Sequence, residues 1–178
     1  MHGTLWDFSL EIYARPEVAS ACLRCQDEAG ADVNLILFLL WRTLAGHCLT
    51  EGDIVSVDEQ VALWREQVVK PLRVLRRTLK SRSLDQSGAF REQIKAAELE
   101  AERIEQEALS RTVADSVRPT SQLAPGDAAQ ANLQAYAAVI GRSLPKQAVN
   151  ALLEALGSFT ERVSERCDQG QGLRRDHV

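Results

Sequence analysis

Hydrophobic residues recur at helical spacing from the start of the chain. Leu5, Phe8 and Ile12 fall on one face of a predicted first helix. Thr4 can cap this helix, and Asp7, three residues later, completes a pattern close to a capping box. No segment alternates hydrophobic and polar residues over the length of a strand, so the pattern predicts helices throughout.

The segment from Pro16 to Trp41 predicts two helices joined by a tight turn. Pro16 suits the first turn of the earlier helix. Gly30 stands where a helix end favours a residue in the left-handed region, and Asp32 stands where the next helix needs an N-cap. Residues 33–41 are almost entirely hydrophobic, which predicts a helix enclosed on nearly all sides in the middle of a bundle.

The next predicted helix begins with Ser56 as its cap, because Glu59 stands three residues later and completes a capping box. Its hydrophobic stripe covers residues 57–79 at helical spacing. Pro71 lies inside this stripe, and a proline there removes a helix hydrogen bond, so we expect a kink or two abutting helices.

Together these patterns predict an all-α fold, a bundle of six or seven helices with one long charged helix at about residues 89–117 and a C-terminal helical pair. We expect residues 5–79 to form the main core, with the three tryptophans as large anchors. The predicted organisation is a helical core domain with the long charged helix at 1–117, a linker at 118–126, the helical pair at 127–167 and a frayed tail at 168–178.

Composition agrees with a helical protein and limits its partners. Aromatic residues make up only 5% of the chain, and the net charge of −4 gives no overall attraction to nucleic acid or anionic lipid. The longest hydrophobic run, at 35–41, is far shorter than the ~20 residues that span a bilayer. The N-terminus lacks the pattern of a secretory signal. We therefore expect a cytoplasmic protein without membrane contact.

One group of residues has the composition of a metal site. Cys22 and Cys25, with His47 and Cys48, supply the residue types of a Cys3His zinc site. However, Cys22 and Cys25 fall within a helix on a hydrophobic stripe, where cysteine behaves as a small hydrophobic residue. The sequence also has no nucleophile elbow, P-loop or dinucleotide-binding motif. We predict no metal site, no cofactor and no catalytic residue.

The turn around residue 30 is a candidate polar site, formed by Gln26, Asp27, Asp32 and Asn34. Its acidic residues lack the alternating pattern of a calcium-binding loop, and Asp32 already has a capping role, so a structural interpretation is favoured. We expect Asn34 to hydrogen-bond to Gln26 or Asp27.

Charge is distributed unevenly along the middle of the chain. Between Ser56 and Arg82, seven basic residues stand against three acidic ones, whereas residues 92–107 are mainly acidic. Neighbouring helices either pair these charges or present a face that binds phosphates or an acidic partner. The candidate binding face consists of Lys70, Arg73, Arg76, Arg77 and Lys80.

Three motifs resemble a known family: L-W-D-F-S at residues 5–9, Q-D-x-x-G-A-D-V-N at 26–34 and L-R-x-x-R-R-x-L-K at 72–80. With them, residues 5–109 are similar to an uncharacterised bacterial family, a domain of unknown function. The resemblance implies a cytoplasmic helical protein with no assigned activity, and it carries over no catalytic residue.

Three functions fit these features. The first is a non-enzymatic interaction or adaptor protein that docks a protein partner through the charged long helix and the basic face. The second is nucleic-acid or ribosome association through the basic helix at 65–82. The third is a small-molecule-binding protein or enzyme with a polar site at the turn 26–34.

Geometry separates these functions. Pairing of Arg73, Arg76 and Arg77 with acidic residues of the long helix speaks against the second function. A concave pocket that joins Asp27, Asp32 and an arginine favours the third.

Overall fold

The computed structural model describes residues 3–81, 87–112 and 123–172, and every regular element in these ranges is helical. The elements are α1 (Leu5–Tyr13), α2 (Pro16–Ala29), α3 (Val33–Thr43), α4 (Glu51–Trp64), the π-helix η1 (Arg65–Val69), α5 (Lys70–Ser81), α6 (Ser87–Thr112), α7 (Pro125–Val139) and α8 (Lys146–Gly172). Because α4, η1 and α5 follow one another without a break, the described ranges form seven continuous helices. The predicted all-α bundle is confirmed.

Local sequence signals place the first helix boundaries. Thr4 caps α1, since its Oγ1 accepts from the Asp7 N–H at 3.1 Å and the Asp7 carboxylate accepts from the Thr4 N–H at 3.0 Å. Gly30 ends α2 with a φ of 71°. Asp32 caps α3 by accepting from the Leu35 N–H at 2.8 Å. All three predicted signals are confirmed.

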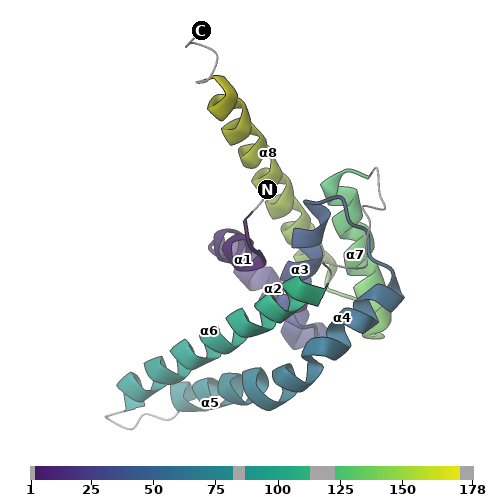
Figure 1. The fold of residues 1–178 in the computed structure, drawn as a ribbon. Coiled ribbons are helices and arrows are strands. Elements are labelled where there is room, and N and C mark those ends of the chain that lie inside the picture. The colour runs from purple at the N-terminus through teal and green to yellow at the C-terminus, as the bar shows by residue number, and fades with distance from the viewer. Residues whose placement is uncertain (1–2, 82–86, 113–122, 173–178) are drawn as a thin grey trace.

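The hydrophobic helix α3 lies in the centre of the molecule. Residues 34–40 are all buried, and α3 contacts α1, α2, α6 and α7 (Figure 1). The core around it also includes Leu133 of α7 and Leu152 and Leu156 of α8. The enclosed helix predicted at 33–41 is therefore confirmed, and the core extends beyond residues 5–79.

Helices α5 and α6 pack side by side as an arm that extends from the rest of the bundle, which we call the body (Figure 1). The arm follows the π-helical segment η1, where the Lys70 N–H donates to the Arg65 carbonyl five residues earlier. Pro71 has no N–H to offer the carbonyl of Gln67, which an α-helix would require. The interruption predicted near Pro71 thus takes the form of a widened helical turn.

The predicted start of the fourth helix was wrong. α4 begins at Glu51, five residues before the predicted cap, and Ser56 lies exposed within it. Thr50 is the cap, because its Oγ1 accepts from the Asp53 N–H at 3.2 Å while the Asp53 carboxylate accepts from the Thr50 N–H at 2.9 Å. This pair has the same spacing as Thr4 and Asp7 and comes earlier in the chain than the predicted pair.

The tryptophans are not the main core anchors that the sequence analysis predicted. Trp6, Trp41 and Trp64 are only partly buried, whereas the largest fully buried side chain is Phe38. An indole N–H needs an acceptor when it is buried. Trp64 meets this need at the arm, where its Nε1–H donates to the Ala101 carbonyl at 3.0 Å.

The predicted division into four parts stays a prediction. Most of the linker at 118–126 and the end of the tail at 168–178 lie outside the described residues, as does the end of the predicted long helix. Within the described ranges, α2 packs on α8 and α3 packs on α7. None of the helices described there has both the length and the hydrophobic character needed to cross a membrane.

The left-handed conformation of Gly30 gives a stability prediction. A Cβ added at Gly30 meets no atom within 4 Å, so only backbone strain opposes the substitution. We expect Gly30→Ala to lower the free energy of unfolding by about 1–2 kcal/mol, measured by equilibrium unfolding in urea with helical circular dichroism as the signal.

The matched control for this prediction is Gly157→Ala, within α8. Its Cβ also meets no atom within 4 Å, and Gly157 does not have a positive φ. Alanine should therefore raise the free energy of unfolding by up to about 1 kcal/mol there, because it is the better helix former. A stabilising effect at both positions would contradict the strained turn at Gly30.

Candidate functional site

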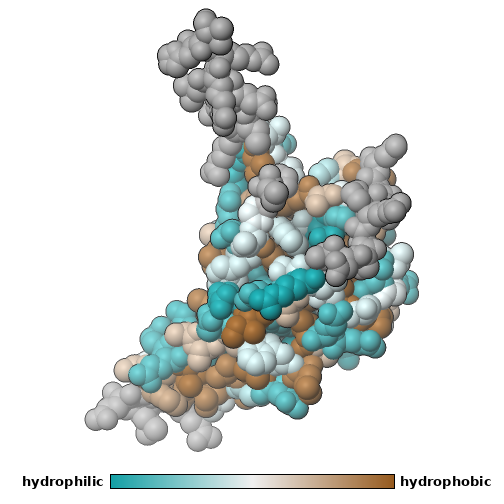
Figure 2. Space-filling model, viewed as in Figure 1, coloured by the Kyte–Doolittle hydropathy of each residue, from teal (hydrophilic) through white to brown (hydrophobic). Residues whose placement is uncertain are grey.

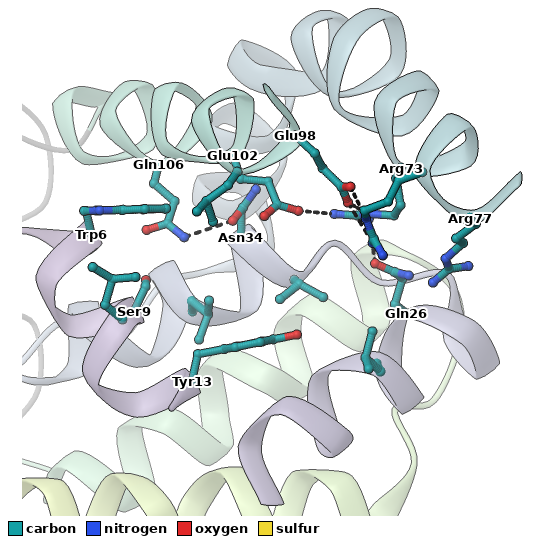
Figure 3. A pocket seen from close by; sticks show the side chains of 16 residues that line it. Trp6, Ser9, Tyr13, Gln26, Asn34, Arg73, Arg77, Glu98, Glu102 and Gln106 are labelled. Carbon is teal, nitrogen blue, oxygen red and sulfur yellow. Dashed lines mark hydrogen bonds and ion pairs between the residues drawn. The ribbon is translucent and has the colours of Figure 1, made fainter. Parts of the chain in front are cut away.

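A pocket of about 180 Å³ lies where the arm meets the body. Residues of α1, α2, α3, α5 and α6 line it (Figure 3). We call it the leucine-rimmed pocket, because half-exposed leucines surround buried polar groups in it. Its lining residues are Trp6, Ser9, Leu10, Tyr13, Leu23, Gln26, Val33, Asn34, Leu37, Arg73, Arg76, Arg77, Glu98, Leu99, Glu102 and Gln106.

Helix α1 gives this pocket one complete face. Trp6, Ser9, Leu10 and Tyr13 are three or four residues apart, so they project from one side of the helix. The core face of the same helix begins at Leu5, which is buried. α1 therefore joins the hydrophobic core on one side and the pocket on the other.

The arm closes one end of the pocket with ion pairs. The guanidinium of Arg73 donates to Gln26 Oε1 at 2.5 Å, to Glu102 Oε1 at 2.6 Å and to Glu98 Oε1 at 3.4 Å (Figure 3). Arg76 also binds Glu98, through both carboxylate oxygens. A buried charge is tolerated only when it is paired, so these contacts fix α5 against both α6 and α2.

Burial and nearby opposite charges shift the pKa values of these groups in opposite directions. Burial raises the pKa of Glu102, although the hydrogen bond from Arg73 opposes the shift. For Arg73, burial lowers the pKa, but the hydrogen bond to Glu102 and the nearby carboxylates outweigh it, so the pKa is raised. The guanidinium of Arg73 thus keeps its charge inside the protein.

The predicted basic face is divided by this arrangement. Arg73 and Arg76 pair with acidic residues of the long helix, as the ion-pairing interpretation requires. Arg77 is exposed and lies 3.5 Å from the carboxylate of Asp27. The nucleic-acid hypothesis stays a prediction that depends on the exposed members of the face, which are Lys70, Arg77 and Lys80.

Asn34 has different partners from those predicted. Its Nδ2 donates to Glu105 Oε2 at 2.8 Å, and its Oδ1 accepts from Gln106 Nε2 at 2.9 Å. The prediction of a bond to Gln26 or Asp27 was wrong, because α6 packs on α3 and brings both partners to this side chain. The amide of Asn34 thus donates one hydrogen bond and accepts another.

Two buried polar atoms, both in residues that line the pocket, have no hydrogen-bond partner within the protein. They are Ser9 Oγ and Gln106 Oε1, and the exposed fractions of the two residues are only 4% and 2%. Gln106 uses its Nε2 for Asn34, so its oxygen is left to accept from elsewhere. Leaving such an atom unpaired costs about 1–3 kcal/mol, and both residues line the same pocket (Figure 3).

A second pocket, of about 440 Å³, lies on the side of Arg73 that faces α4 and α7. We call it the charged pocket, and it joins Asp27, Asp32, Arg65 and Arg73, the combination that favours a small-molecule site. Its charges already pair with one another. Arg65 donates to Asp58 at 2.6 Å and lies 3.8 Å from Asp32. No residue that lines it has a buried side-chain nitrogen or oxygen without a partner.

Cys22 and Cys25 are buried in the hydrophobic core. Burial raises the pKa of the Cys22 thiol to about 12 and that of the Cys25 thiol to about 11, which disfavours the thiolates that bind metals. Within the part of the chain that the structure describes, no three His, Cys, Asp or Glu side chains gather closely enough to hold a metal ion.

The sequence analysis did not predict most residues of the leucine-rimmed pocket. As candidate site residues it named Gln26, Asn34, Arg73, Arg76 and Arg77 of the leucine-rimmed pocket, but not Ser9 or Gln106. One signal was available, since Trp6, Leu10 and Tyr13 form a second hydrophobic stripe on the first helix beside the stripe of Leu5, Phe8 and Ile12.

Residues 4–109 match the family described as "Protein of unknown function (DUF2390)". This confirms the resemblance found over residues 5–109. The matched range includes every residue that lines the leucine-rimmed pocket, whereas α7 and α8 lie outside it. No curated protein and no solved structure matches the chain.

The buried carboxyl group of Glu105 gives a pH prediction. Burial and the negative charge of Asp32 raise its pKa from 4.5 to about 8, although Asn34 and Arg65 oppose the shift. Between these pH values the folded protein binds a proton that the unfolded chain releases, so stability falls as the pH rises from about 4.5 to about 8. Glu105→Gln, which is neutral at every pH, should remove this contribution.

We expect Glu105→Gln to gain stability relative to the unmodified protein as the pH rises from 5 to 9, by an amount on the order of a few kcal/mol. Urea unfolding at several pH values measures the difference. Glu107→Gln, at an exposed site on the same helix, is the control and should show no such gain. A Glu105→Gln effect that is the same at every pH would contradict a proton held at this group.

Proposed function

Because the chain belongs to a family of unknown function, DUF2390, we propose its function from the geometry of its own pocket. It is a non-enzymatic docking protein that takes one side chain of a protein partner into the leucine-rimmed pocket. The arm and the body supply opposite sides of this binding site. Ion pairs within the arm and the hydrogen bond from Arg73 to Gln26 hold it in one shape.

The rim of the pocket carries this proposal. Leu10, Leu23 and Leu99 line the pocket and are 51%, 44% and 49% exposed. They come from α1, α2 and α6, so three separate helices place hydrophobic surface around one opening. A small ligand inside the pocket would leave this surface in water, whereas a partner protein would cover it. An anchor side chain surrounded by contacts that exclude water is the usual arrangement of a protein interface.

The surface of the arm supports the same function. Hydrophobic side chains reach the surface of α5 and α6 in the view of Figure 2, and Val74, Phe90 and Leu99 are among the exposed ones. By contrast, charged residues on the outer side of α6 pair within the helix, as Arg103 does with Glu100 at 2.7 Å. We therefore assign the contact with the partner to hydrophobic surface rather than to the charges of the long helix.

A non-enzymatic role is proposed because both carboxylates of the pocket are engaged with arginines. Glu98 and Glu102 both bind arginines, which leaves neither carboxylate poised as a general base. The cytoplasmic location expected from the sequence is part of the same proposal.

The second candidate is a small-molecule-binding protein that uses the charged pocket. Its volume of about 440 Å³ lies within the ~300–1,000 Å³ of ordinary ligand sites. Its mixture of acidic and basic residues suits a small zwitterion, whose two charges would have to compete with the existing ion pairs. We rank it second because buried side-chain atoms without a partner occur among the residues of the leucine-rimmed pocket, but not among those of the charged pocket.

Selection of a displayed random peptide library against the purified protein tests the docking function. We expect peptides whose affinity falls at least about tenfold in the double variant Leu23→Asp/Leu99→Asp, since charges at the rim cannot be buried by a hydrophobic partner. Fluorescence polarisation measures Kd, and thermal unfolding confirms that the variant is folded.

Leu63→Asp is the matched control, because Leu63 is 67% exposed and lines neither pocket. Peptide affinity should change less than about twofold in this variant. Selected peptides that bind the rim variant and the control equally well would overturn the docking function.

A further inference from the structure

Resting on the docking function proposed above, we propose that the side chain taken by the leucine-rimmed pocket is a tyrosine of the partner. Its ring lies against the hydrophobic walls, and its hydroxyl bonds to Ser9 and Gln106. The pocket thus recognises a phenol group presented by a protein.

The size of the pocket fits one large side chain. At about 180 Å³ it is comparable to a cavity of ~150 Å³ that binds one benzene ring. Its walls include Trp6, Val33 and Leu37, which offer hydrophobic contact to a flat ring. A serine or threonine of the partner would leave most of this volume and these walls without contacts.

The unpartnered groups need a hydrogen-bond donor, which a hydroxyl supplies. Because Gln106 donates to Asn34 through Nε2, its free Oε1 can only accept, and it needs a donor from the occupant. Ser9 Oγ can donate as well as accept. A phenol hydroxyl donates one hydrogen bond and accepts another, so a single tyrosine satisfies both groups. An indole N–H only donates, and a phenylalanine or leucine leaves both groups unpaired.

The charges of the pocket favour a neutral occupant. Three arginines (Arg73, Arg76 and Arg77) and two glutamates (Glu98 and Glu102) line it, so the formal charge is 3 − 2 = +1. A lysine or arginine of the partner would meet this excess of positive charge. A carboxylate cannot donate to Gln106 Oε1, and Arg73 and Arg76 are already bound to Glu102 and Glu98.

Small probes test the chemistry of the occupant directly. We expect 4-methylphenol to bind the whole 178-residue chain and to shift the amide NMR signals of residues in α1, α3 and α6 that line the pocket. Toluene, which lacks the hydroxyl, and 4-methylanisole, whose oxygen cannot donate, should bind at least about tenfold more weakly, because each leaves Gln106 Oε1 unpaired.

The Ser9→Ala variant separates hydrogen bonding from fit. Ser9 Oγ has no partner in the protein, so its removal breaks no internal bond. We expect weaker binding of 4-methylphenol, by about threefold to tenfold, and unchanged binding of toluene. Ser56→Ala, at an exposed site on α4, should change neither.

Peptides from the library selection distinguish this inference from the docking function itself. A selected peptide should contain a tyrosine whose replacement by phenylalanine weakens binding at least about tenfold. Binding that depends on the rim leucines but tolerates this replacement overturns the tyrosine assignment and leaves the docking function intact. Peptide binding that is unchanged in the Leu23→Asp/Leu99→Asp variant overturns both the tyrosine assignment and the docking function. Toluene binding as tightly as 4-methylphenol, or no binding of 4-methylphenol at the pocket, also overturns the assignment.

Discussion

The burial of two arginines, Arg65 and Arg73, between the arm and the body constrains the whole molecule. A guanidinium cannot lose its water without carboxylates to replace it, and here the carboxylates come from different helices. Asp32 caps α3 and also lies beside Arg65, while Glu102 of α6 binds Arg73. Arg73 also donates to Gln26 of α2 at 2.5 Å, and this hydrogen bond joins the arm to the helix that precedes the turn.

The carboxyl groups of Asp32, Asp58 and Glu105 all lie within 4.0 Å of Arg65. With Arg65 occupied by Asp58 and Asp32, Glu105 has Asn34 as its hydrogen-bond donor, and burial keeps its carboxyl protonated near neutral pH. Asn34 in turn holds Gln106 in one orientation. The free oxygen of Gln106 in the pocket is thus the end of a chain of contacts that begins at the buried arginines.

Local signals predicted the helix boundaries well where one signal stood alone. Gly30 and Asp32 were identified correctly because each acts through backbone atoms within a few residues of itself. The prediction failed at α4, where Thr50 with Asp53 and Ser56 with Glu59 offered two capping patterns of the same form within one segment. The sequence pattern alone does not rank two such caps, because each pattern consists only of two residue types three positions apart.

The sequence by itself determined that this chain is helical, where its central helix lies and which turn precedes it, since these depend on residues no more than about four apart. Only the tertiary structure decided what each polar side chain contacts. Ser9 and Gln106 are almost a hundred positions apart, and Arg73 reaches Gln26 across 47 positions. The packing of five helices brings these residues to one pocket, and no spacing rule along the chain encodes that packing.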